Sequence, residues 1–292
     1  MYIGFKAIAQ GDSHKEMGLP CQDAALFLTA PGCGFALVAD GHGSAKHFRS
    51  GLGSQIAVGT AASAIDTFIK LQSKENKKLS DAVYMDNQLR QLERHIIVSW
   101  RQRVLVSFDD NPLSEEEKAV CAKHDMDPEN ENDRVRLYGT TLIAAFVYKK
   151  GWFVLQIGDG KCVCLDPGGV PFFPPELEDE SLAGGKTTSL CDSDAAGHFR
   201  HAFGAETIRG ITVASDGVSD SFIPEDYLKL HSRLLNDFLE DAKKAEAGLQ
   251  KSISVWSSRG SRDDVSMAGL FFRADMGIGN VFRILSRRET KP

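Results

Sequence analysis

Short apolar and β-branched runs recur along this chain, and most are bounded by Gly, Pro or Asp. Such runs predict β-strands. They cover Phe5–Ala9, Ala24–Thr29, Phe35–Ala39, Thr141–Tyr148, Trp152–Ile157, Lys161–Leu165, Ile211–Ala214 and Val265–Phe272. Two tight polar links, 148–152 and 158–160, separate consecutive runs and predict β-hairpins.

Apolar residues spaced three and four apart predict helices in three other segments. These segments are Ala45–Leu71, Leu79–Val106 and Asp226–Leu249. The order along the chain is strands, two helices, more strands, then a helix and a last strand. This order is typical of an α+β fold in which helices cover antiparallel sheets. We find no internal repeat, and the pattern predicts a single domain over residues 1–292.

Composition narrows the function classes. The chain has 292 residues, of which 42% are hydrophobic, and its net charge is −6, so clustered basic residues for binding nucleic acid are not expected. No apolar run approaches the length of a membrane span, and the first residues lack a secretory pattern. We therefore predict no membrane partner and a cytoplasmic location. The six cysteines are irregularly spaced, which favours reduced core thiols over disulfides or a zinc site.

One segment differs from the rest in composition. Residues 109–133 contain ten acidic residues and two lysines, with few apolar side chains. Such a composition buries too little apolar surface to offset the entropy lost on ordering. We predict a mobile acidic insertion at 109–133.

Acidic residues stand at the ends of four predicted strands. Asp40 follows FALVA, Asp159 follows FVLQIG, Asp216 follows ITVAS, and Asp263-Asp264 precedes VSMAGLFF. Each acid alone is explained by a turn or a helix cap. Four together favour a cation among them, because converging carboxylates repel one another. Oxygen ligands alone select hard divalent ions such as Mg²⁺ or Mn²⁺.

The stretch VADGHGSAKH adds two glycines and a histidine to this pattern. Gly41 and Gly43 flank His42, which predicts a sharp backbone bend and a carbonyl close enough to bind an ion. For His42 two interpretations stay open: a catalytic acid, or a side chain that caps the turn.

Five segments together resemble a known family. They are GLPCQDAALF, FALVADGHGS, YGTTLIAAFVYKKGWFVLQIGDGK, ITVASDGVSD and GSRDDVSMAGL. In order and spacing they resemble the metal-dependent (type 2C) protein serine/threonine phosphatases, most closely the compact bacterial branch. The resemblance runs from about Gly11 to Phe272. It implies a sandwich of two antiparallel β-sheets flanked by α-helices, with a metal centre at one end.

The resemblance also implies roles for individual residues. Asp40 is similar to the carboxylate that bridges two divalent cations, Mn²⁺ or Mg²⁺, and the Gly41 carbonyl to a ligand of the second. Asp216 and Asp263 match the remaining ligands of the first ion. Such a pair acidifies a water molecule, which attacks phosphorus in line with the leaving oxygen. His42 matches the histidine that protonates the leaving group.

The chain departs from the family pattern in three places. Gln22 stands where many relatives have a glutamate, while Asp23 remains and is expected to orient metal-bound water. The arginine that grips phosphate in eukaryotic relatives is absent, and Lys15 or His14 is our candidate replacement. The acid that holds a third metal in some relatives aligns near Arg136, so a third site is not expected.

The resemblance predicts a phosphoprotein phosphatase that acts on phosphoserine and phosphothreonine in signalling. Its implied partners are a phosphorylated protein and a Ser/Thr kinase. The alternative is a non-catalytic module on the same fold that binds a phosphoprotein or metal, which Gln22 and the missing arginine favour. A third reading, a hydrolase of small phosphoesters, shares the chemistry and differs in substrate.

Overall fold

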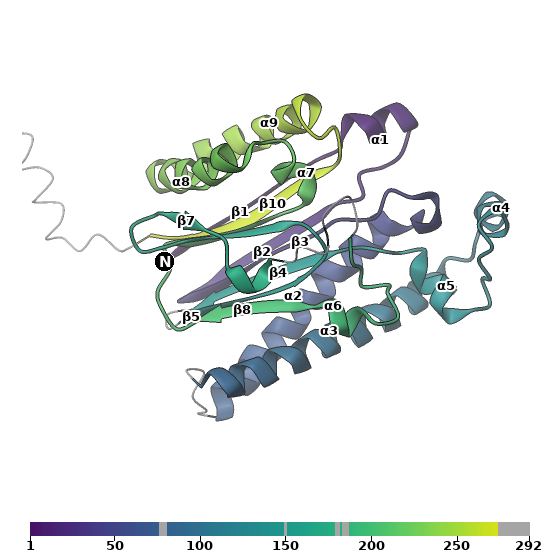
Figure 1. The fold of residues 1–292 in the computed structure, drawn as a ribbon, viewed down its shortest axis with the longest axis horizontal. Coiled ribbons are helices and arrows are strands. Elements are labelled where there is room, and N and C mark those ends of the chain that lie inside the picture. Colours follow the sequence, from purple (N-terminus) through teal and green to yellow (C-terminus); the bar gives the residue numbers. More distant parts are fainter. Residues whose placement is uncertain (76–80, 149–150, 179–181, 183–186, 274–292) are drawn as a thin grey trace, which may run out of the picture.

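The computed structural model describes residues 1–75, 81–148, 151–178, 182 and 187–273. These residues form two antiparallel sheets packed face to face, with helices on both outer surfaces (Figure 1). The α+β class and the sandwich expected from the resemblance are therefore confirmed.

Each sheet has five strands in an order that differs from the sequence. The first sheet has the order β1-β10-β9-β6-β7 and the second β2-β3-β4-β5-β8. The first contains β1 (Tyr2–Ala9), β10 (Val265–Phe272), β9 (Gly210–Ala214), β6 (Lys161–Leu165) and β7 (Pro171–Phe172). The second contains β2 (Ala24–Ala30), β3 (Cys33–Ala39), β4 (Leu142–Tyr148), β5 (Gly151–Ile157) and β8 (Arg200–Gly204).

Two helices cover each outer face. The helices α2 (Ser50–Glu75) and α3 (Ala82–Asp110) pack on the second sheet, and α8 (Pro224–Glu240) and α9 (Ala242–Arg259) pack on the first (Figure 1). The shorter helices are α1 (Asp12–Met17), η1 (Ala45–His47), α4 (Glu115–Lys123), α5 (Glu131–Arg136), η2 (Pro175–Leu177), α6 (Ala195–His198) and α7 (Asp216–Ser219). Among the described residues, no helix is long and apolar enough to cross a membrane.

The layers enclose three hydrophobic cores. Trp100 and Leu89 lie between the second sheet and its helices, Val154 and Val213 lie between the sheets, and Phe5 lies under α8 and α9. Because both faces of each sheet are covered, central strands such as β4 and β5 are apolar at nearly every position. This is why their sequences read as continuous hydrophobic runs.

The structure corrects two predicted elements. The helix expected over Asp226–Leu249 is two helices, because Asp241 takes an extended conformation and caps α9 by accepting hydrogen bonds from the amides of Lys243 and Lys244. The hairpin expected at 158–160 is a crossover, because β5 and β6 belong to different sheets. The predicted β4–β5 pair is antiparallel as expected, although turn residues 149–150 lie outside the described residues.

The acidic segment contains two helices that its composition did not indicate. Ser114 and Glu117 form a reciprocal capping box at the start of α4. The Arg49 guanidinium binds both carboxylate oxygens of Glu117, at 2.8 and 2.7 Å. Cys121 and Val135 are buried against the rest of the domain. A few well-placed contacts fold this segment locally, and its mobility remains a prediction.

Candidate metal centre

The two sheets bring their acidic strand ends to the same edge of the sandwich. Asp40 directly follows β3 in one sheet, and Asp216 lies two residues after the end of β9 in the other, as the first residue of α7. Asp23 precedes β2, whose Ala24 pairs with Ala39 of β3. Asp263 lies just before β10, which runs antiparallel to β9. The fold therefore gathers acids that are far apart in the sequence.

The backbone around Asp40 is fixed by the start of β4. Its amide donates to Thr141 Oγ1 at 3.0 Å, and its carbonyl accepts from the Thr141 amide at 2.9 Å and from Thr140 Oγ1 at 2.8 Å. These bonds fix the point from which the carboxylate projects, before any ligand arrives.

Burial and mutual repulsion make the carboxylates resist ionisation. Burial raises the pKa of Asp40 well above its usual range, and the charges of Asp23 and Asp216 add to this effect. Burial likewise raises the pKa of Asp216 to about 6, although a hydrogen bond with Asp40 opposes it. The charges of Asp159 and Asp263 raise the pKa of Asp216 further. A nearby cation would reverse this cost by stabilising the ionised forms.

Several buried oxygens at this edge have no hydrogen-bond partner among the described residues. They are both carboxylate oxygens of Asp23, Oδ1 of Asp216 and Oε1 of Gln22. Burial raises the pKa of Asp23 to about 8, although the nearby hydroxyls of Ser266 and Ser215 oppose this shift. Buried polar atoms are nearly always satisfied in folded proteins, so this cluster of orphaned acceptors indicates a cationic or hydrated ligand.

The neighbouring acids Asp263 and Asp264 have different environments. Asp264 is buried and accepts from the amides of Gly11 at 2.7 Å and Gln22 at 2.5 Å, and its Oδ2 lies 2.9 Å from Nδ1 of His14. The side chain of Asp263 is 57% exposed. Asp264 therefore ties together the loops that carry Gly11 and Gln22, while Asp263 is the member of the pair that is open to an ion.

Position 41 requires glycine because neighbouring backbone leaves no room for a Cβ, and not because of the predicted bend. A Cβ at this position would lie 2.6 Å from the Gln22 carbonyl oxygen and 2.9 Å from the Ser50 backbone. Neither Gly41 nor Gly43 has a positive φ, and a Cβ on Gly43 would meet only ordinary contacts at 3.5 Å and beyond. The close packing of three backbone segments excludes a side chain at Gly41.

His42 follows Asp40 by two residues, and its ring contacts a second histidine. The ring of His47 packs edge-on against the ring of His42, with 4.9 Å between centroids. Nδ1 of His47 faces the Arg136 carbonyl oxygen. A Cβ on Gly139 would lie 2.8 Å from His42 Cδ2 and closer still to His47. His47 is only partly exposed, since the His42 ring packs against it.

Burial lowers the pKa of His42 to about 4, and the neighbouring His47 acts in the same direction. In the absence of a ligand His42 is therefore neutral near pH 7. A bound anion would favour its protonated form.

The donor set fits a hydrated divalent cation. In the part of the chain that the structure describes, no three His, Cys, Asp or Glu side chains converge on one point closely enough to hold a metal. The side chains of Asp40 and Asp216 instead contact each other, and the orphaned Gln22 oxygen lies 3.7 Å from the position of a Cβ on Gly43. Mg²⁺ characteristically binds through one or two carboxylates and retains several waters. The orphaned acceptors could hold such waters.

The candidates for gripping phosphate differ in their placement. Lys15 pairs with Asp12 at 2.9 Å on the surface. His14 is buried, and its Nε2 would lie 3.5 Å from a Cβ on Gly43, so it faces the Gly43 loop. Arg136 pairs with Asp133 at 3.3 Å. Of the two predicted replacements, His14 lies nearer to the loop that carries His42.

Sequence reasoning missed Asp220, whose charge raises the pKa of Asp216. Its amide donates to the Asp216 carbonyl at 2.8 Å, so the two acids are separated by one helical turn. The four-residue spacing after a strand could have revealed this relationship. Asp159 stabilises the turn after β5, because its Oδ1 accepts a hydrogen bond from Thr187 Oγ1 at 2.9 Å.

Fold and site together define an αββα sandwich with a carboxylate-rich centre at one end. The family model described as protein phosphatase 2C matches residues 10–255. The chain belongs to the protein phosphatase 2C family. No curated protein matches it.

Several solved bacterial structures have a similar fold. PppA, described as a key regulatory component of T6SS in Pseudomonas aeruginosa, is 16% identical with a TM-score of 0.55, over 92% of this chain and 97% of that one. Stp1 from Staphylococcus aureus is 13% identical with a TM-score of 0.55, over 94% and 96%. The Mycobacterium tuberculosis phosphatase PstP/Ppp is 14% identical with a TM-score of 0.55, over 94% and 99%. Similarity at this level supports the fold.

Proposed function

We propose that this protein is a metal-dependent phosphatase that hydrolyses phosphoserine and phosphothreonine in proteins. The observation that carries the proposal is the cluster of buried, unpartnered carboxylate oxygens where the two sheets end, in a chain of the protein phosphatase 2C family. A phosphoric monoester needs positive charge around its oxygens and an activated water, and a pair of divalent cations supplies both when bound.

The residues of the site have two roles, to bind the cations and to orient water. Asp40, the Gly41 carbonyl, Asp216 and Asp263 hold two cations, Mn²⁺ or Mg²⁺. Gln22 and Asp23 orient water through the oxygens that have no protein partner. A structure of a similar phosphatase, PstP, is described as a complex with 2 manganese ions, which supports this type of centre.

His42 moves the proton. Its low pKa makes it neutral in the free protein, and the dianionic phosphate of a substrate would raise that pKa. The protonated ring then donates to the departing serine or threonine oxygen. The contact with His47 holds the ring beside the centre.

The partners follow from this chemistry: a phosphorylated protein as substrate and a Ser/Thr kinase that supplies it, in a cytoplasmic signalling role. One similar fold is described as a key regulatory component of T6SS and another comes from the bacterial stressosome, described as controlling secondary messenger signaling. These descriptions support a regulatory setting.

The test compares phosphate release from a phosphothreonine peptide, a phosphotyrosine peptide and p-nitrophenyl phosphate, each with Mn²⁺ or EDTA. We expect metal-dependent release that favours phosphothreonine. Release in EDTA would contradict the proposal, and activity on the small ester alone would indicate a hydrolase of small phosphoesters. Asp86→Asn, which alters a carboxylate on α3, is the matched control and should retain activity.

A second function has its own observation. Gln22 is neutral where many relatives carry an acid, so the cation beside it is held by less negative charge. A non-catalytic module that binds a phosphoprotein or metal would use the same site without turnover. Metal binding without phosphate release, together with a gain of activity in Gln22→Glu, would favour this alternative.

A further inference from the structure

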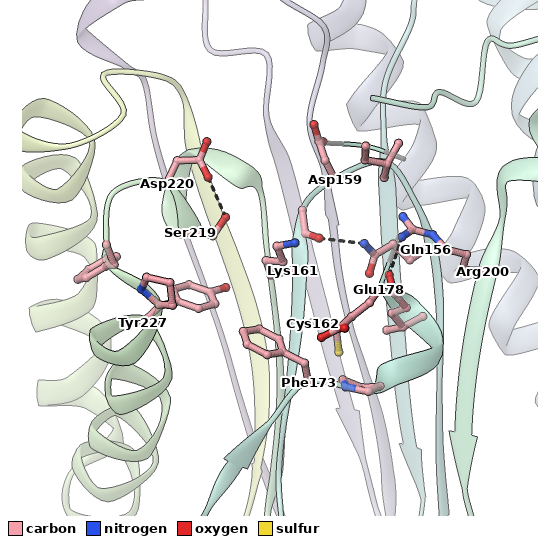
Figure 2. A pocket seen from close by; sticks show the side chains of 16 residues that line it. Gln156, Asp159, Lys161, Cys162, Phe173, Glu178, Arg200, Ser219, Asp220 and Tyr227 are labelled. Atoms are coloured by element: carbon pink, nitrogen blue, oxygen red, sulfur yellow. Dashed lines mark hydrogen bonds between the residues drawn. The ribbon is translucent and has the colours of Figure 1, made fainter. Parts of the chain in front are cut away.

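A pocket of about 540 Å³ lies beside the metal centre, between β6 and β7 on one side and the α7–α8 region on the other (Figure 2). Its rim shares two turns with the centre, because Asp159 and Asp220 both line it. Asp220 is one helical turn from Asp216, or about 5 Å along the helix axis. A peptide residue spans roughly 3.5 Å. A neighbour of the phosphorylated residue would therefore reach this pocket.

One wall of the pocket is aromatic. The rings of Phe173 and Tyr227 are nearly parallel, with 6.3 Å between their centroids, and the ring of Phe222 lies 6.4 Å from that of Tyr227. Figure 2 shows Phe173 and Tyr227 facing the same space. Aromatic faces of this kind attract a planar cation as well as apolar groups.

Two buried oxygen atoms in the lining have no hydrogen-bond partner among the described residues. They are the Tyr227 hydroxyl and Oε1 of Gln156, in residues only 2% and 3% exposed. The Gln156 amide nitrogen donates to the Gly160 carbonyl at 2.8 Å (Figure 2), which fixes the side chain and leaves Oε1 as the end without a partner. Both atoms can accept a hydrogen bond.

The charges of the lining favour a cationic occupant. Three carboxylates, from Asp159, Glu178 and Asp220, outnumber the two cations, Lys161 and Arg200. The guanidinium of Arg200 already donates to two backbone carbonyl oxygens. Lys161 is exposed, and its charge lowers the pKa of Asp220, which burial otherwise raises. The carboxylates of the lining therefore exceed its cations by one.

We propose that this pocket binds an arginine side chain of the phosphoprotein substrate, a few residues from the phosphorylated serine or threonine. Arginine matches each feature: a flat cation for the aromatic wall, and five N–H donors for the carboxylates, Gln156 Oε1 and the Tyr227 hydroxyl. The proposal rests on the proposed phosphatase function. It adds a sequence preference that the metal centre alone does not provide.

The experiment uses phosphothreonine peptides in which a single arginine moves from three residues before the phosphothreonine to three residues after it. Each peptide has a partner with citrulline, which keeps the shape and loses the charge. At one position we expect the KM of the arginine peptide to be at least fivefold lower than that of its citrulline partner, with kcat unchanged. KM values within twofold at every position, or a preference for norleucine over arginine, would overturn the proposal.

Two variants locate the effect. Glu178→Gln and Tyr227→Phe should each reduce the arginine preference to less than twofold, while Glu176→Gln, two residues away and outside the lining, should retain it. Hydrolysis of p-nitrophenyl phosphate should be unchanged in all three. A full preference in both pocket variants would contradict the assignment.

Failure of the phosphatase assignment gives a different result. In that case the wild type hydrolyses neither the peptides nor p-nitrophenyl phosphate. The same peptides, labelled for fluorescence anisotropy, then test the pocket by binding, with tighter binding of the arginine peptide expected. Equal affinity for the arginine and citrulline peptides would overturn the proposal.

Discussion

Two groups of carboxylates in this protein differ in their hydrogen-bond partners and in the direction of their pKa shifts. On α3, Glu93 is buried and lies 2.7 Å from Nδ1 of His201, whose Nε2 lies 3.1 Å from Asp86. At the metal centre, the oxygens of Asp23 and Oδ1 of Asp216 have no partner. The pKa of Asp86 is lowered by a hydrogen bond from Arg90, whereas burial raises the pKa of Asp216.

This difference separates a structural group from a functional one. Where acids join β8 to α3, the chain supplies its own cations, so the group stabilises the fold without a ligand. At the strand ends the described residues place no cation against the carboxylate oxygens of Asp23 or Oδ1 of Asp216, and a bound cation would offset the cost of burying them. The following predictions test this contrast, from the largest effect to the smallest.

Replacing a carboxylate of the metal centre should abolish turnover without unfolding the protein. Asp216→Asn keeps the shape of the side chain and removes its charge, so we expect at least about a 100-fold loss of kcat, the scale of a lost electrostatic contact in an active site. Phosphate release and circular dichroism measure the two properties. Near-normal turnover would contradict the assignment of Asp216.

Replacing the histidine of the structural group should instead destabilise the fold. Burial lowers the pKa of His201, but Glu93 and Asp86 outweigh it, so its pKa is raised overall. The ion pair therefore stabilises fully below the ordinary histidine pKa near 6.5, and this contribution is lost as the pH rises through the raised value.

We expect His201→Gln to lower the free energy of unfolding by about 3 kcal/mol at pH 6 and by clearly less at pH 9. Urea unfolding of the wild type and the variant at both pH values measures this. An equal loss at both pH values would show that packing, and no ion pair, holds β8 to α3.

The contact between His42 and His47 should affect kcat rather than KM. His47→Ala removes the ring that packs against His42, and we expect about a tenfold lower kcat because the proton donor is less well positioned. His47→Phe retains a ring and should recover part of the loss. Wild-type kcat in His47→Ala would mean that His42 is held by other groups.

The smallest effect concerns the acidic segment. We predict that limited proteolysis first cuts the chain within residues 109–133. Arg49→Met removes the guanidinium that binds Glu117 and lies over the rings of Phe108 and Tyr138, so cleavage should be several times faster. The pair should contribute about 1 kcal/mol. Resistance of the segment in both proteins would show that it is rigid.

The sequence was informative where one strand and one acid stood together. The position of Asp40 and Asp216 at the ends of strands could be predicted, because the runs FALVA and ITVAS lead to them. The different environments of Asp263 and Asp264 could not, since only the fold shows which of them faces Gly11 and Gln22. β8 was missed because RHAFG is short and contains two polar residues, Arg200 and His201. His201 pairs with acids of α3, and Arg200 donates to the carbonyls of Leu177 and Gly158. The helices in 109–133 were missed because caps and single contacts, rather than composition, stabilise them.

The measurement that tests this account most directly is calorimetric titration of the metal-free protein with Mn²⁺. Wild type and Asp86→Asn should bind the ion with the same stoichiometry and affinity, and Asp40→Asn should lose most of that binding. If Asp40→Asn binds Mn²⁺ as the wild type does, or if the wild type binds none, the unpartnered carboxylates at the strand ends are not a metal centre.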